Sequence, residues 1–217
     1  CSSDLPNVSW SFAPSLQAWT WLRTARQVRH GLEAARFAAS EYDALPKYRN
    51  RSAVRAPRLV TRLANDDAMR RRVMRTLMTV ERGIPPPPAL VEWMQALAPD
   101  VVLLASVTSD GALQMDHLKA ALSLGLRTSL PIYSWDHLSG KAVVHIRPAQ
   151  LLVWNDTQRR EAIEMHGIDP ARLVVTGAYG YEQWFERQPS VTRDEFCTAI
   201  GLDRKSTRLN SSHTDIS

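Results

Sequence analysis

Cysteine is scarce in this chain, and its scarcity removes whole classes of site. Of 217 residues, only Cys1 and Cys197 are cysteines, which is too few for a disulfide framework or a structural zinc site. The histidines also lack metal-ligand spacing to one another or to a cysteine, as shown by His117, His145 and His166. The sequence therefore predicts no metal site and no cofactor, and it favours a reducing cytoplasm.

Long apolar runs are absent as well, so the sequence contains no membrane-spanning segment. The chain starts at Cys1 without an initiator methionine and without the charged and apolar regions of a signal peptide, so we expect it to be cut at its start. The stretch from Asp203 to Ser217 matches the in-frame translation of a sequencing adaptor, and we interpret it as a non-native tail. A genuine polar, disordered tail is the alternative.

Positive charge is concentrated in the first part of the chain. Residues 1–90 hold 15 Lys and Arg against 7 Asp and Glu, whereas residues 91–202 hold 9 against 13. The densest cluster is Arg70 to Arg72 with Arg75. A solvated helix face explains such a cluster, and so does a patch for an anionic membrane or a lipid-linked, phosphate-bearing acceptor. No nucleic-acid recognition motif accompanies it, so we predict no nucleic-acid partner.

Residues 1–88 are expected to form a helical, basic part of the first domain. Apolar spacing predicts a helix over 19–40, with its arginines off the buried stripe, and a second helix over 66–80, capped by Asn65 or Asp66. The predicted buried positions are Trp21, Ala25, Val28, Leu32, Ala35 and Ala39 in the first helix, and Met69, Val73, Leu77 and Val80 in the second. Residues 45–58 read as a connector. Pro85 to Pro88 should form a stiff, non-helical boundary.

From Ala89 onward the pattern alternates between helices and short apolar strands. Helices are predicted over 89–97, before Gly125, and over 156–166, the last capped by Asn155 with Gln158 as its partner. Strands are predicted over 101–105, 127–133, 151–154 and 172–176. Wholly apolar strands alternating with helices indicate a parallel sheet covered on both faces. The predicted fold class is α/β, with a Rossmann-like, doubly wound parallel sheet.

Ligands of open parallel sheets bind outside the carboxyl ends of the strands. The loops at that edge supply Ser106, Asp110, Trp135 and Asn155 as candidate substrate-binding residues, and no glycine-rich phosphate loop is present. The loop 134–141 is chemically the richest. There Asp136 or His137 is a candidate acid or base, and Lys141 a candidate ligand for an anionic group. A turn-capping Asp and an exposed His explain the same residues without any chemistry.

Several of these segments resemble a known superfamily. The runs from Pro99 to Leu104, Tyr133 to Asp136, Val153 to Asn155 and Val174 to Gly177 are similar to the N-terminal domain of GT-B-type glycosyltransferases, and to the related CDP-glycerol glycerophosphotransferases and UDP-N-acetylglucosamine 2-epimerases. The resemblance covers roughly residues 89–202.

The resemblance implies a Rossmann-like half over 89–177, an interdomain crossover over 178–189, and the start of a second, truncated domain over 190–202. It further implies an enzyme of polysaccharide biosynthesis that transfers a sugar from a nucleotide-activated donor to an acceptor. Because this superfamily binds the donor mainly in its second domain, we expect the present fragment to be inactive alone. A 2-epimerase-like isomerase and a non-catalytic binding module are the alternatives.

Overall fold

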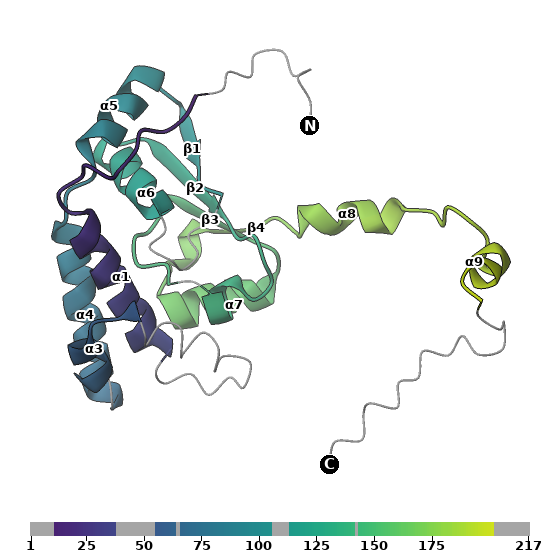
Figure 1. Ribbon diagram of the computed structural model, residues 1–217, viewed down its shortest axis with the longest axis horizontal. Coiled ribbons are helices and arrows are strands. Elements are labelled where there is room, and N and C mark those ends of the chain that lie inside the picture. Colours follow the sequence, from purple (N-terminus) through teal and green to yellow (C-terminus); the bar gives the residue numbers. More distant parts are fainter. Residues whose placement is uncertain (1–10, 38–54, 64–65, 106–112, 142, 202–217) are drawn as a thin grey trace. The chain divides into compact units, whose positions relative to one another are not determined.

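A computed structural model describes residues 11–37, 55–63, 66–105, 113–141 and 143–201 (Figure 1). The chain divides after Gly177 into a larger unit and a smaller one. Among the described helices, none is both long and apolar enough to pass through a membrane.

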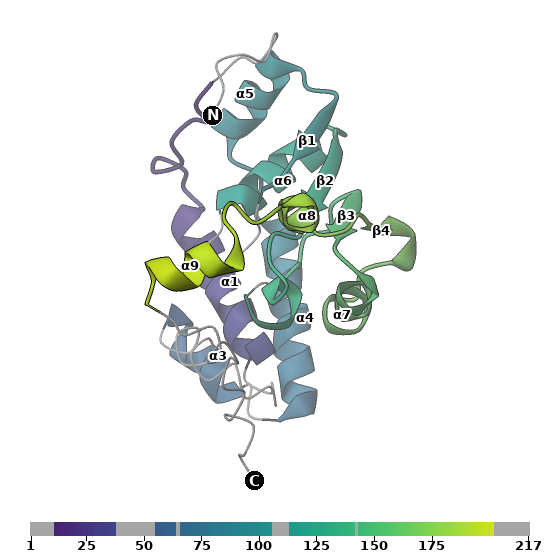
Figure 2. The same cartoon turned by 90° about the vertical axis from the view of Figure 1, so that its right-hand side faces the viewer.

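The larger unit is built on four parallel strands. They are β1 (Val101–Leu103), β2 (Arg127–Pro131), β3 (Gln150–Val153) and β4 (Leu173–Val175). The strands lie side by side in chain order, and every neighbouring pair is parallel (Figure 2). Strands that run in the same direction need crossover connections. The predicted α/β class with a parallel sheet is confirmed.

One face of the sheet carries the main core. The crossovers on it are α6 (Leu113–Ser123), the π-helix η1 (His137–Lys141), α7 (Asp156–His166) and the short η2 (Pro170–Arg172). Leu130 of β2 and Leu151 of β3 are register partners, and both are fully buried against Leu118 of α6, Leu138 of η1 and Ala162 of α7. Every second residue of these two strands thus packs against one layer of helices.

On the opposite face of the sheet, residues of the two edge strands are exposed within the described part of the chain, whereas Ser129 of the inner strand β2 is buried. Val101 and Leu103 of β1 are 48% and 69% exposed, and Val174 of β4 is 39% exposed. Successive side chains of a strand point to opposite faces, so these three share the face that the helices do not cover. The predicted second covering layer is not formed by the described residues.

A helical group precedes the sheet (Figure 1). It consists of α1 (Leu22–Phe37), α3 (Arg58–Leu63) and α4 (Asp67–Gly83), and α4 is capped by the Asp66 carboxylate, which accepts from the Met69 N–H. The predicted stripes are mostly confirmed: Ala25, Val28, Leu32 and Ala35 are buried, and Met69, Val73 and Leu77 are half-buried. Ala39 lies outside the described residues.

Three predictions for this group were wrong. Trp21 and Val80 are more than two-fifths exposed, because α1 begins only at Leu22 and because α4 turns Glu81 inward in place of Val80. Arg29, expected on the solvated side of α1, is buried instead, because carboxylates from α4 and α6 surround its guanidinium.

The proline run leads into α5 (Pro88–Leu97). Pro85 to Pro87 are non-helical as predicted, but Pro88 is the first residue of the helix. Proline is well suited to that position, because its missing N–H would have had no partner in the first turn. The helix packs Leu90 and Met94 against Ala120 and Ala121 of α6.

The smaller unit, residues 178–217, contains α8 (Tyr179–Glu186) and α9 (Arg193–Ala199). The predicted capping box is present, because the Thr192 hydroxyl accepts from the Glu195 N–H and the Glu195 carboxylate accepts from the Thr192 N–H. The predicted crossover, 178–189, contains α8, a helix that the sequence pattern did not indicate.

Candidate functional site

The carboxyl ends of β2 and β3 bring two of the predicted loops together. Gln158, 2% exposed in the first turn of α7, joins them with its side-chain amide. Its Oε1 accepts from the Trp154 N–H at 2.8 Å, just after β3, and its Nε2 donates to the Ser134 carbonyl oxygen at 3.1 Å, just after β2. A buried amide with satisfied hydrogen bonds fixes local geometry, so this side chain links the two loops in addition to the backbone pairing of β2 and β3.

Asn155 lies at this edge with a defined structural role. Its side-chain oxygen accepts from the Gln158 N–H at 3.0 Å and caps α7, as the sequence indicated. The Gln158 side chain does not complete a capping box, since it accepts from Trp154 and not from Asn155. Asn155 itself remains exposed, which leaves its amide nitrogen accessible from solvent.

Asp136 is placed by the turn that follows β2. The Ser134 hydroxyl donates to Asp136 Oδ1, and the Ser134 carbonyl accepts from the His137 N–H at 3.1 Å. The Asp136 carbonyl in turn accepts from the Gly140 N–H at 3.0 Å, within the turns of η1. Asp136 is half-buried, and its carboxylate is oriented by the Ser134 hydroxyl.

Trp135 and His137 point to different environments although they are two residues apart. Trp135 is 70% exposed, so its indole offers a free apolar surface beside Asp136. His137 is only 1% exposed, because η1 turns it into the interior next to the buried Leu138. The exposed His that the sequence suggested is therefore wrong, because the sequence gave no indication of this burial.

The remaining predicted site residues fall outside this description. Ser106 and Asp110 lie outside the described residues. Lys141 ends η1, and its side chain likewise lies outside them. In the described ranges, no group of three or more His, Cys, Asp and Glu residues is arranged to hold a metal ion.

His166, at the end of α7, is held as one neutral tautomer below this edge. Its Nδ1 accepts from the Val144 N–H at 3.2 Å, and its Nε2 donates to the Leu138 carbonyl at 2.8 Å. Burial is the main cause that lowers the pKa of His166; the bond to Leu138 opposes it, the nearby charges of Arg36, His137 and His145 add to it, and together they place the pKa at about 4. The neutral ring therefore bridges η1 to the segment before β3.

A buried ionic cluster was missed by sequence reasoning. Arg29 of α1 donates to Glu81 Oε1 of α4 from Nε at 3.1 Å and from Nη2 at 2.9 Å, and to Asp116 of α6 from Nη1 at 3.0 Å and from Nη2 at 2.5 Å. Lys119 Nζ lies 3.5 Å from Glu81 Oε1, and His145 Nε2 lies 3.9 Å from the same atom. Glu81 and Asp116 are fully buried.

Electrostatics explain how carboxylates are tolerated there. Burial alone would raise the pKa of Glu81, but the neighbouring His145, Arg29 and Lys119 lower it below its ordinary value. Burial opposes the charge of Arg29 too, and the Asp116 and Glu81 carboxylates raise its pKa. The cluster ties three helices together, and its carboxylates are enclosed by cations of the protein, so we assign it a structural role.

Comparisons with known proteins give no match: no family model, no curated protein and no solved structure is significantly similar to this chain.

Proposed function

We propose that this chain belongs to a glycosyltransferase-like enzyme, which transfers a sugar from a nucleotide-activated donor to an acceptor bound at the carboxyl ends of β2 and β3. The observation that carries the proposal is the Gln158 bridge, which holds Asp136 and Asn155 at one edge of a parallel sheet. Ligands of open parallel sheets bind at this edge. In this proposal the sheet belongs to a larger, doubly wound Rossmann-like domain, and a second domain supplies most of the donor site.

Asp136 is the general base in this proposal. It would accept the proton of an acceptor hydroxyl while that oxygen bonds to the sugar carbon and the nucleotide phosphate leaves with its bonding electrons. The Ser134 hydroxyl orients the carboxylate. We give this role to Asp136 and not to His137, because His137 is 1% exposed.

Trp135 and Asn155 would hold the sugar. An exposed indole presents an apolar face to the C–H side of a sugar ring, and Trp135 is 70% exposed. The Asn155 oxygen is used by the α7 cap, so its amide N–H₂ is the group available to a sugar hydroxyl.

The test is turnover of a panel of nucleotide sugars by the full-length enzyme, with nucleotide release and product structure both measured. Loss of a positioned general base typically costs 10²–10⁴-fold in rate, so Asp136→Asn should lower kcat by about 100-fold or more. The matched control is Asp169→Asn, since Asp169 caps η2 before β4 begins, at the other edge of the sheet. This control should retain full activity.

Trp135→Ala should raise KM with a smaller effect on kcat, and the exposed Phe12→Ala should change neither. Formation of a 2-epimer without sugar transfer would point to an isomerase. Normal turnover by Asp136→Asn, or no consumption of any nucleotide sugar, would contradict the proposal.

A further inference from the structure

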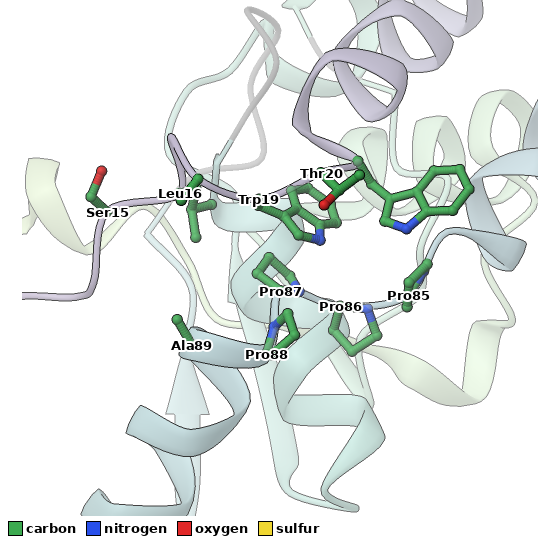
Figure 3. Close-up of a pocket in the computed structure, with 11 residues that line it drawn as sticks. Ser15, Leu16, Trp19, Thr20, Pro85, Pro86, Pro87, Pro88 and Ala89 are labelled. Carbon is green, nitrogen blue, oxygen red and sulfur yellow. The ribbon is translucent and has the colours of Figure 1, made fainter.

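A cleft of about 390 Å³ lies between the segment before α1 and the proline run before α5. Figure 3 shows Trp19 facing Pro86 and Pro87 across this cleft, with Thr20 beside the indole. Its lining contains no charged side chain, and the side-chain polar groups in it are the Ser15 and Thr20 hydroxyls and the two indole N–H groups. The cleft is therefore suited to an apolar group.

Both walls of the cleft are anchored in the core. Leu16 is buried with Leu90 and Met94 of α5, and Trp19 packs against the cluster of Ala25 and Val28. The backbone N–H of Trp19 donates to the Leu16 carbonyl, and the backbone N–H of Leu22 donates to the Trp19 carbonyl. Proline rings fix the backbone of the opposite wall. A preformed site of this kind spends little conformational entropy when it binds a ligand.

A second cleft of about 370 Å³ adjoins the first, because both are lined by Trp19 and Thr20. This one is basic: Arg23, Arg26 and His30 line it, and no carboxylate does. Their spacing of three and four residues places them on one side of α1. The positive end of the α1 dipole lies at the same place.

The two arginines are the cations available to a ligand. Both are exposed, and neither forms an ion pair or hydrogen bond with the described residues. The His30 ring has its Nδ1 3.9 Å from Glu33 Oε2, so it lies beside a carboxylate of the protein. Two guanidinium groups near one another suit a phosphate, which they bind with charge-assisted hydrogen bonds.

We propose that the adjoining clefts form one binding site for an amphiphilic phosphate, with a short hydrocarbon chain between Trp19 and the prolines and its phosphate on Arg23 and Arg26. A hydrocarbon suits the first cleft better than a nucleobase, because its lining has no amide or carboxylate side chain to recognise the edge of a base. The clefts lie on elements that precede the sheet, and the proposal does not depend on the transferase activity.

Isothermal titration of the chain with geranyl phosphate tests this site. Inorganic phosphate supplies the charge alone, geraniol the hydrocarbon alone, and UMP a nucleobase with the same charge. We expect geranyl phosphate to bind at least about tenfold more tightly than any of the three, because only it fills both clefts. Its affinity should fall as salt rises. Equal binding of UMP would overturn the hydrocarbon assignment, and equal binding of geraniol would overturn the role of the arginines.

Variants locate the site. Arg23→Gln and Arg26→Gln should each weaken geranyl phosphate binding by about fivefold to tenfold, and the exposed Arg71→Gln on α4 should leave it unchanged. Trp21 lines the first cleft and is 44% exposed, so Trp21→Ala should weaken binding without unfolding the protein, whereas Trp184→Ala should not affect it. Circular dichroism confirms that each variant is folded. Unchanged affinity in all three cleft variants would refute the proposal.

Discussion

Replacement of Arg29 by Met is expected to be among the most destabilising single changes in the helical group. The guanidinium donates four hydrogen bonds to Glu81 and Asp116, and its side chain is 3% exposed. Met has a similar length and is apolar, so the variant removes the charge and leaves little empty volume. Two buried carboxylates then face each other beside Lys119.

The expected loss follows from that geometry. Removal of one partner from a buried ion pair typically costs about 3–5 kcal/mol, because the other charge stays buried without compensation. Whole domains are stable by only about 5–15 kcal/mol, so Arg29→Met should lose a large fraction of the folding free energy. Arg26→Met, one turn earlier and exposed, should change it by less than about 0.5 kcal/mol.

Urea denaturation followed by circular dichroism measures both variants. The loss for Arg29→Met should also be smaller at pH 5 than at pH 7, because Arg29 is one of the charges that lower the pKa of Glu81. Without Arg29, burial raises that pKa, and a protonated Glu81 no longer repels Asp116. A loss below about 1 kcal/mol at pH 7, or an equal loss at both pH values, would refute this reasoning.

Three further changes test other parts of the structure. The folded-state pKa of His166 is about 4, below its ordinary 6.5, so the unfolded state binds more protons than the folded state between these pH values. The free energy of unfolding should therefore fall as the pH drops from about 6.5 to about 4, by up to about 3 kcal/mol. Urea titrations of His166→Gln should show a flatter dependence of this free energy on pH. Gln158→Leu should cost about 1–3 kcal/mol by leaving the Trp154 N–H without its acceptor and should speed amide exchange in residues 134–136, whereas Gln158→Glu keeps an acceptor and should cost less. Leu103→Gln, on the open sheet face, should change the free energy of unfolding by less than about 0.5 kcal/mol, and Leu130→Gln, fully buried in β2, by more than about 2 kcal/mol; a similar loss in both would show that the open face is covered in solution.

Contacts between residues close in sequence account for the helix ends and loops that the sequence predicted. A cap depends on residues within four positions of one another, so Asn155 before α7 and Thr192 before α9 could be recognised directly. The same holds for the αL glycine after α7, where Gly167 has φ 61°. The loops after β2 and β3 followed from the alternation of apolar strands and helices.

Contacts between distant segments account for what the sequence did not reveal. Arg29 lies 52 residues from Glu81 and 87 from Asp116, and nothing in a single helix pattern distinguishes an arginine that meets two carboxylates from one that meets water. His137 shows the same limit on a shorter scale: its burial depends on the π-helical turn of η1, which places it inside while Trp135 stays exposed.

The residues of β1 bear on what covers the open face of the sheet. In β1, Val101, Val102 and Leu103 are all apolar, although successive side chains point to opposite faces. A strand with only one face in a core alternates apolar and polar residues, and a strand buried on both faces does not. Val102 packs into the core, whereas Val101 and Leu103 are exposed on the other face. The composition of β1 therefore fits the larger doubly wound domain proposed above, in which a second layer, not formed by the described residues, would cover Val101 and Leu103.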